Sequence, residues 1–182
     1  RFTFELLAAM GFDLEAGRQD KSVHPFTGGT HPLDVRLTTR IHEHTPLSAI
    51  FGAIHEGGHG LYEQGFHEAH YRTPIANAPS MGLHESQSRL WENVVGRSLG
   101  FWSHFYPRLQ KHFPKELGDV TLEQFHRAVN RVEKSLTRVE ADEVTYGLHV
   151  TLRYELELEL LRGSLAVADL PEAWNAKMKS ML

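Results

Sequence analysis

The chain has 182 residues, of which 41% are hydrophobic and 23% charged, so it is long enough for one domain with a sizeable core. Its net charge of −4, with acidic and basic residues interspersed, argues against a nucleic-acid partner, which requires a basic surface. Because there is no cysteine, a metal ion would have to be bound by histidines and carboxylates. The lack of cysteine also fits a reducing cytoplasm.

The sequence carries no sign of a membrane-spanning run or a signal peptide. No apolar run approaches the roughly 18–20 residues that span a bilayer, and the opening RFTFELLAAMGF lacks a signal-peptide cleavage pattern. We therefore expect a soluble cytoplasmic protein with no membrane partner. The chain starts at Arg1 rather than methionine and stops within the amphipathic run AWNAKMKSML. We expect residues 1–182 to form a single unit that is an internal piece of a longer chain.

The hydrophobic pattern predicts a mostly α protein with a minor β element. Within the Gly- and Pro-rich stretch 20–45, DVRLTTR alternates apolar and polar residues, which indicates a strand in a small sheet. Thr45 and Pro46 then offer an N-cap and a first helical residue. The expected helices are residues 2–10, a helix from 46 to about 62, and further helices at about 81–98, 99–112, 121–139, 142–162 and after Pro171.

The stretch His55-Glu56-Gly57-Gly58-His59 lies inside the helix predicted after Pro46. Residues four apart project from one helical face, so His55 and His59 can both place an imidazole nitrogen on one ion. Glu56 borders the same face and is available as a base for a metal-activated water. The pattern arises by chance in roughly one sequence in ten of this kind, so its context matters.

The helix that carries the two histidines also contains glycines at 57, 58 and 60, which is unusual for a helix interior. Each costs about 1 kcal/mol relative to alanine inside a helix. A helix with three of them has to be stabilised by close packing or by a bound metal ion.

A catalytic zinc site needs a third protein ligand and an open position for water. Glu85 lies 26 residues after His59 on the next predicted helix, and His84 beside it is the competing candidate. We favour Glu85, because two histidines and one glutamate form a recurrent peptidase site. The alternative interpretation of Glu85 is an exposed ion pair with Arg89 at i+4, worth tenths of a kcal/mol.

Five ordered motifs resemble those of the carboxypeptidase Taq family of metallocarboxypeptidases. They are His24-Pro25-Phe26 for HPF, Asp34-Val35-Arg36-Leu37-Thr38 for DxRxT, His55 to His59 for HExxH, His84-Glu85-Ser86-Gln87 for HES/GQ, and Thr137-Arg138-Val139-Glu140-Ala141-Asp142 for IRxxAD. The last has threonine where the family has isoleucine, and the family's sixth motif, GxxQDxHW, is absent. The resemblance spans the chain from Val23 to about Asp142.

The resemblance implies a mostly helical, zincin-type metallopeptidase fold with a small β-sheet near the active site. It also implies one zinc or cobalt ion per chain bound by His55, His59 and Glu85, with Glu56 as general base. The implied activity is the release of single residues from peptide C-termini with broad specificity, by a homodimer. Because the sixth motif is missing, we expect these 182 residues to be inactive, or nearly so, on their own.

The resemblance further suggests residues that contact the substrate or support the site. Arg138 is the first candidate for binding the substrate's terminal carboxylate, for which a guanidinium is suited. Residue chemistry alone does not rank it above Arg36, Arg89 or Arg153. His24 is a further substrate-binding candidate. Asp34 and His84 are candidates for supporting the metal ligands from behind, since metal-bound histidines usually donate their other N–H to an acceptor.

Two other functions remain open from the sequence. One is a zincin endopeptidase or peptidyl-dipeptidase, which would share the metal site and treat the substrate terminus differently. The other is a non-catalytic helical oligomerisation module. The presence of Glu56 speaks against the second.

Overall fold

The computed structural model describes residues 1–42 and 44–182, apart from the side chain of Glu140. The chain packs as two compact units, residues 1–126 and 127–182, and each is described here by itself. From the sequence we expected one unit. Among the described residues, no helix combines the length and the apolar composition needed to cross a bilayer.

The first unit is built around the helix that carries the HExxH stretch. Its elements are α1 (Phe2–Met10), β1 (Gly17–Lys21), β2 (Thr27–His31), β3 (Asp34–Thr39), α2 (Pro46–Gln64), the 3₁₀ turns η1 (Glu68–His70) and η2 (Pro74–Ala76), α3 (Met81–Arg89), the π-helical turn η3 (Leu90–Val95), α4 (Leu99–His112), α5 (Pro114–Leu117) and the start of α6 (Leu122–Val129). The mostly α fold with a small sheet is thus confirmed.

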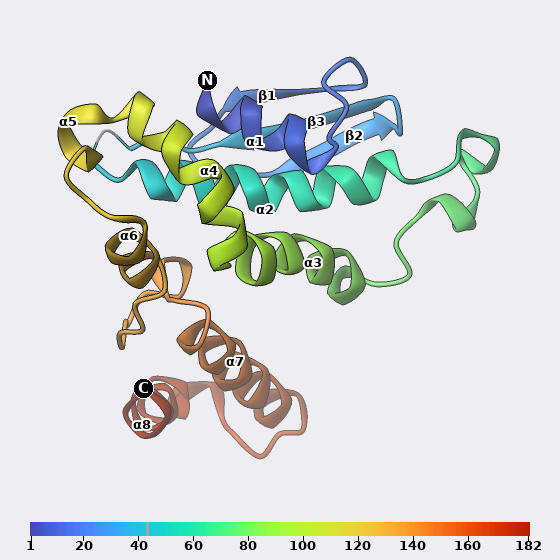
Figure 1. Cartoon of the computed structure of the whole chain (residues 1–182). Helices are drawn as coiled ribbons and strands as arrows, with labels where there is room; N and C mark the ends of the chain where they lie inside the picture. Colours follow the sequence, from blue (N-terminus) through green and yellow to red (C-terminus); the bar gives the residue numbers. More distant parts are fainter. Residues whose placement is uncertain (43) are drawn as a thin grey trace. The chain divides into compact units, whose positions relative to one another are not determined.

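The sheet has the order β1-β3-β2, with β1 parallel and β2 antiparallel to the central β3. β3 alternates as the sequence predicted, because Val35 and Leu37 point into the core and are almost completely buried. Figure 1 shows α2 running between this sheet and α3, and α2 contacts β2, β3, α1, α3 and η3. The HExxH helix is therefore enclosed by several elements.

The glycines of α2 are what allow this enclosure. A Cβ at Gly57 would lie 2.6 Å from Leu7 Cδ2 of α1, and one at Gly60 would lie 2.6 Å from Phe12 Cε2. Contacts this short would force Leu7 and Phe12 to shift, so the absence of a side chain at both positions lets these two residues pack directly on α2. Of the two sources of stabilisation expected for this glycine-rich helix, close packing is present in the structure.

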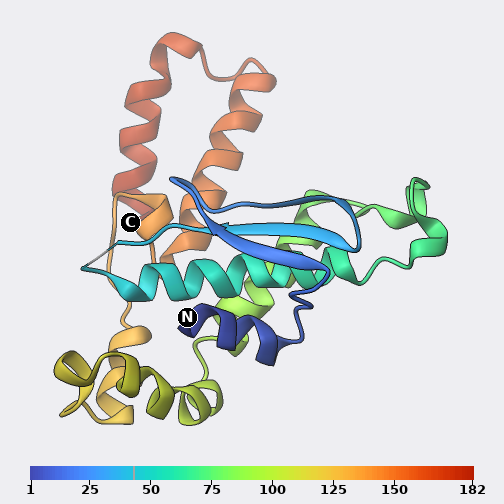
Figure 2. The ribbon, with the colours of Figure 1, turned by 90° about the horizontal axis from the view of Figure 1, so that it is seen from above.

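The second unit holds the end of α6, the 3₁₀ turn η4 (Arg138–Glu140), α7 (Thr145–Leu161), η5 (Val167–Asp169) and α8 (Leu170–Met181). α7 and α8 lie side by side, as Figure 2 shows, around a core of Leu152, Leu156 and Met178. Both helices were predicted from the sequence.

Three sequence predictions differ from the structure in detail. Thr45 occupies the N-cap position of α2, but its side chain makes no capping hydrogen bond. The helix predicted at 81–98 changes to a π-helical turn after Arg89. The helix predicted at 121–139 was wrong beyond Val129.

Tertiary hydrogen bonds explain the early end of α6. The Glu133 N–H donates to Asp142 Oδ2 at 2.9 Å, and the Ser135 carbonyl accepts from the buried His149 Nε2 at 2.8 Å. These bonds to α7 and the segment before it replace the helical bonds that the sequence pattern suggested.

Candidate metal centre

His55 and His59 project from one face of α2, one turn apart, with their ring centroids 4.9 Å apart. Their side chains are only 17% and 15% exposed. The two imidazoles therefore share one face of the helix, as the i, i+4 spacing predicted, and lie at one partly buried point.

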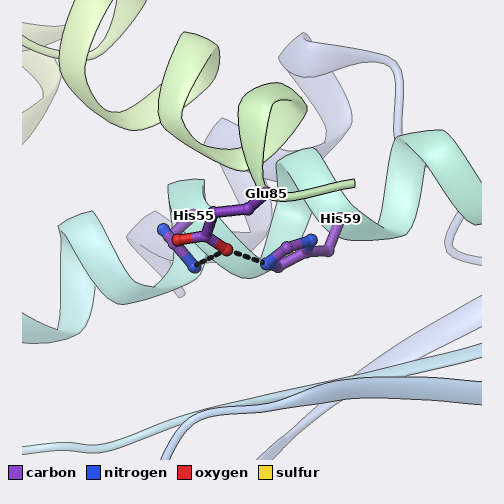
Figure 3. A group of neighbouring side chains, drawn as sticks. All are labelled: His55, His59 and Glu85. Carbon is purple, nitrogen blue, oxygen red and sulfur yellow. Dashed lines mark ion pairs between the residues drawn. The ribbon is translucent and has the colours of Figure 1, made fainter. Parts of the chain in front are cut away.

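Glu85 reaches the same point from α3, the next helix. Its Oε2 atom lies 3.0 Å from His59 Nε2 and 3.6 Å from His55 Nε2 (Figure 3). One ligand atom from each of the three side chains lies within 4.8 Å of the other two, so the group can hold a metal ion. Two imidazole nitrogens and one carboxylate leave a fourth position open, as a catalytic zinc site requires.

His55 is held from behind by Glu92 of η3. Its Nδ1 lies 2.7 Å from Glu92 Oε2, which also accepts a hydrogen bond from Arg89 Nη1 at 3.0 Å. Because an ionised carboxylate only accepts, the His55 proton belongs on Nδ1. The lone pair of Nε2 is then directed at the point where the three side chains meet.

His84 contacts the other histidine and is not part of the ligand group. Its Nδ1 lies 2.6 Å from His59 Nδ1, and its Nε2 lies 2.6 Å from Glu63 Oε1. Both ring nitrogens of His84 are therefore occupied. Of the two candidates for the third ligand, the structure brings Glu85 to the ligand group and leaves His84 behind it.

Arg89 binds the oxygen of Glu85 that does not face the histidines. Its Nε donates to Glu85 Oε1 at 3.0 Å, so the i+4 ion pair weighed as an alternative is present. It coexists with the metal-binding geometry, because it uses Oε1 and leaves Oε2 toward His55 and His59. Arg89 thereby orients Glu85 to offer a single oxygen.

The electrostatics of the group favour a bound cation. Burial alone raises the pKa of the Glu85 carboxyl, but the hydrogen bond with His59 and the charges of His55 and Arg89 lower it to about 2. Glu85 is therefore ionised at neutral pH. Its Oε2 faces two imidazole nitrogens at short distance, and such lone-pair atoms repel one another unless a proton or a metal ion lies between them. The donor set thus fits a divalent metal ion.

Glu56 lies on α2 with only 6% of its surface exposed. Thr27 of β2 holds its carboxylate, because Thr27 Oγ1 lies 2.6 Å from Glu56 Oε2 and 3.0 Å from the Glu56 carbonyl oxygen. Within the described part of the chain, Glu56 Oε1 has no hydrogen-bond partner. One oxygen of the carboxylate is fixed, and the other is available to accept a proton.

The described hydrogen bonds of Asp34 connect it to residues of β2 and β3. Asp34 forms a two-point ion pair with Arg36, at 2.8 Å from Nε and 3.0 Å from Nη2, and also accepts from Thr30 at 3.1 Å. The described partners of His55 Nδ1 and His59 Nδ1 are Glu92 and His84. The supporting role of Asp34 stays a prediction. His24 lies exposed in the loop between β1 and β2.

Arg138 belongs to the second unit, where it starts the turn η4. Its Nη1 donates to Tyr146 Oη at 2.8 Å, and its guanidinium carbon lies 5.6 Å from the centre of the Tyr146 ring. The side chain is half-buried and held in place. Its arrangement within this unit is compatible with a fixed guanidinium that binds an anion.

Three residues that contact the site were not predicted from the sequence. Glu63 lies four residues after His59 on the histidine face of α2, and Glu92 lies two turns after Glu85, so helical periodicity was a signal for both. Thr27 directly follows the HPF motif, but nothing in its local sequence pointed to Glu56. That contact depends on how β2 packs on α2.

The whole chain, including the residues of this site, matches one known protein family. The family model described as carboxypeptidase Taq (M32) metallopeptidase matches residues 1–182. The chain belongs to the carboxypeptidase Taq (M32) family. The family resemblance stated from the five motifs is thereby confirmed, and so is the fold that it implied.

Curated relatives in the M32 family are named carboxypeptidases. Thermostable carboxypeptidase 1 of Thermus thermophilus is 59% identical over 182 residues, which is 100% of this chain and 36% of that relative. Carboxypeptidase 1 of Bacillus subtilis is 44% identical over 176 residues, covering 97% of this chain and 35% of the relative. The chain thus spans about a third of the length of the relatives that it matches.

Solved structures of M32 proteins share the fold. The M32 carboxypeptidase from Deinococcus radiodurans superposes with a TM-score of 0.97 at 48% identity, over 100% of this chain and 36% of that one. Metallocarboxypeptidase 1 of Trypanosoma cruzi gives 0.93 at 38% identity, over 98% and 36%. The arrangement of helices and strands around the candidate metal centre is therefore that of M32 carboxypeptidases.

Proposed function

We propose that this chain carries the metal centre of a metal-dependent carboxypeptidase that releases single residues from peptide C-termini with broad specificity. The observation that carries the proposal is the convergence of His55 Nε2, His59 Nε2 and Glu85 Oε2 from two helices. The ligand set suits one zinc or cobalt ion per chain. Family membership supports the metallopeptidase assignment.

A divalent ion bound to these three residues would act as a Lewis acid toward the scissile carbonyl and would acidify a water molecule. Glu56 is proposed as the general base. Its Oε2 is held by Thr27, so Oε1 accepts the proton of the attacking water and later delivers it to the leaving amine. The low exposure of Glu56 keeps bulk water from competing for that oxygen.

The release of C-terminal residues requires a group that binds the substrate's free carboxylate. Arg138 is the first candidate, because the bond to Tyr146 fixes its guanidinium. Arg36 and His24 are proposed as further substrate-binding residues. The ion pair with Asp34 supports a role of Asp34 in orienting Arg36. His84, in contact with His59, is proposed to support that ligand.

Several wider proposals rest on the family resemblance. We propose that these residues are an internal piece of a longer catalytic domain, which is supported by the 36% coverage of the Thermus relative. On this proposal the isolated chain is inactive or nearly so, and the longer protein is a homodimer acting on peptides in the cytoplasm. The lack of cysteine is compatible with that compartment.

Metal content of the purified chain tests the centre. We expect near-stoichiometric zinc or cobalt after reconstitution, loss of the ion to a chelator, and a large loss of affinity in Glu85→Ala. Glu68→Ala is the matched control, because Glu68 is an exposed carboxylate outside the ligand group. Absence of bound metal in the presence of excess ion, or equal binding by Glu85→Ala, would reject the proposed ligand set.

Peptide assays on a longer chain that contains these residues test the specificity. A carboxypeptidase releases single residues from free C-termini and does not act on C-terminally amidated peptides. Cleavage of amidated peptides would favour the endopeptidase, and release of dipeptides would favour the peptidyl-dipeptidase. Metal binding without any peptidase activity would favour the non-catalytic module.

A further inference from the structure

We propose that Glu63 is a positioning residue for the metal centre, which acts through His84 to direct the lone pair of His59 Nε2 at the ion. The inference rests on the proposed role of His59 as a ligand. It adds a carboxylate of α2 that lies outside the ligand group and outside every motif of the sequence.

Glu63 fixes the proton of His84. Glu63 Oε1 lies 2.6 Å from His84 Nε2, and the two side chains are 37% and 21% exposed. An ionised carboxylate has no proton to donate, so His84 Nε2 must donate to it. The ring of Tyr62, centred 4.9 Å from that of His84, restricts the imidazole from one side.

The proton on Nε2 decides the state of the other nitrogen. A neutral imidazole with its proton on Nε2 carries a lone pair on Nδ1. His84 Nδ1 therefore accepts at its 2.6 Å contact with His59 Nδ1, and His59 Nδ1 is the donor. A His59 imidazole that carries only this proton presents the lone pair of Nε2, the atom 3.0 Å from Glu85 Oε2.

The proton of each ligand histidine is thus placed on Nδ1 by a carboxylate, directly for His55 and through one more side chain for His59. His55 donates directly to the carboxylate of Glu92, whereas His59 donates to a carboxylate through one intervening imidazole. Helical periodicity explains the reach, because His55, His59 and Glu63 follow one another at intervals of four residues on α2. In both cases the outer N–H is satisfied and Nε2 faces the ligand group.

The alternative role for Glu63 is an ordinary surface ion pair with His84. Such a half-exposed pair contributes little to stability, because solvent screens it. The two roles predict different effects. A surface pair would leave the zinc affinity unchanged, whereas a positioning residue that is lost lowers the zinc affinity, with little effect on stability in either case.

Two measurements on Glu63→Gln test the positioning role. The amide of glutamine both donates and accepts, so His84 is no longer forced to protonate Nε2. We expect zinc affinity, measured by competition with a coloured chelator, to fall by about tenfold. In the metal-free chain, ¹⁵N spectra of the imidazoles should show His84 protonated on Nε2 in the wild type and as a tautomer mixture in the variant.

Matched variants separate charge from hydrogen bonding. Glu68→Gln makes the same charge change at an exposed position and should leave affinity and tautomers unchanged. Glu63→Lys places a donor against His84 Nε2 and should drive His84 toward protonation on Nδ1, with a larger loss of zinc affinity than Glu63→Gln. Glu68→Lys controls for the added positive charge.

The outcomes distinguish this inference from the metal proposal itself. Zinc binding by the wild type together with unchanged affinity and unchanged ¹⁵N spectra in Glu63→Gln overturns the role of Glu63 and leaves the ligand set intact. Failure of the wild type to bind zinc rejects the ligand set, and the ¹⁵N spectra of the metal-free chain then still decide the role of Glu63.

Discussion

Gly58 of α2 faces Ser88 of α3 so closely that a Cβ at residue 58 would lie 2.7 Å from Ser88 Cα and 2.9 Å from the Gln87 carbonyl oxygen. The atoms in the way belong to the backbone, so a side-chain rotation cannot relieve the contact. Gly58 lies between the two histidines in sequence, and Ser88 lies three residues after Glu85. The glycine therefore sets how closely the two ligand-bearing helices approach.

Gly58→Ala should separate α2 from α3. Alanine improves the helix propensity of α2 by about 1 kcal/mol, but overpacking against backbone costs about 1–3 kcal/mol. We expect a lower free energy of unfolding and weaker zinc binding, measured by urea titration and chelator competition. Gly52→Ala is the control, since its Cβ would meet Thr39 Oγ1 at an ordinary 3.4 Å. Equal behaviour of the two variants would contradict the close-approach explanation.

Thr27→Val should destabilise the chain by leaving the Glu56 carboxylate without its hydrogen-bond donor. Glu56 is 6% exposed, and a buried charged group that loses a partner costs about 1–3 kcal/mol. Thr27→Ser keeps the hydroxyl and should stay close to the wild type. Urea unfolding of the three proteins measures the effect. A Thr27→Ser variant as unstable as Thr27→Val would mean that the methyl group, and not the hydroxyl, matters.

Zinc affinity should fall as the pH is lowered. Burial by itself lowers the pKa of His55, but the hydrogen bond and charge of Glu92, together with Glu85 and Glu56, raise it above its ordinary 6.5. In the metal-free chain a proton therefore occupies His55 up to a higher pH and competes with the ion, which needs neutral imidazole. Affinities measured from about pH 8 to about pH 6 should decrease steadily.

Glu92→Gln removes the main cause of the raised pKa. His55 should then lose its proton at lower pH than in the wild type, as an NMR titration of the metal-free chain would show. Glu116→Gln, at an exposed position, is the control for the charge change. A His55 pKa that stays the same in Glu92→Gln would show that Glu92 does not hold this histidine in solution.

Asp142 should make the stability of the second unit depend on acid pH. Its carboxylate accepts from the Val144, Thr145 and Glu133 backbone N–H groups, each at 2.9 Å, and from Thr145 Oγ1 at 3.0 Å. Burial raises its pKa, but these hydrogen bonds outweigh burial and lower it below the ordinary 3.8. The stabilisation is therefore complete above pH 3.8 and is lost as the pH falls through the lower folded-state pKa.

Asp142→Asn should reduce stability at neutral pH by about 1 kcal/mol, because an amide nitrogen faces N–H donors. The difference from the wild type should shrink as the pH drops below about 4. Thermal unfolding monitored by circular dichroism across this range measures both effects. Asp169→Asn is the control in the same unit, since Asp169 makes no side-chain cap to α8. A difference that persists unchanged at low pH would contradict the proposed ionised acceptor.

The elements of the fold were predictable where the local pattern and the packing agree. The helix at 99–112 and the strand of β3 follow apolar periodicity, and the structure confirms both. The predicted helix at 121–139 failed after Val129, because Glu133 and Ser135 bond to groups near and in α7. A periodic pattern reports which faces are apolar and does not report which polar groups bond to each other, so only the folded chain shows these partners.

The same division holds at the metal centre. The sequence by itself determined that His55 and His59 share a face, because helical geometry fixes the placement of residues four apart. Only the tertiary structure decided that Glu85 and not its neighbour His84 meets them, that Thr27 holds Glu56, and that Glu63 and Glu92 lie behind the histidines. Those contacts depend on the distance and angle between elements, which side-chain packing sets over the whole unit and no local stretch of sequence specifies.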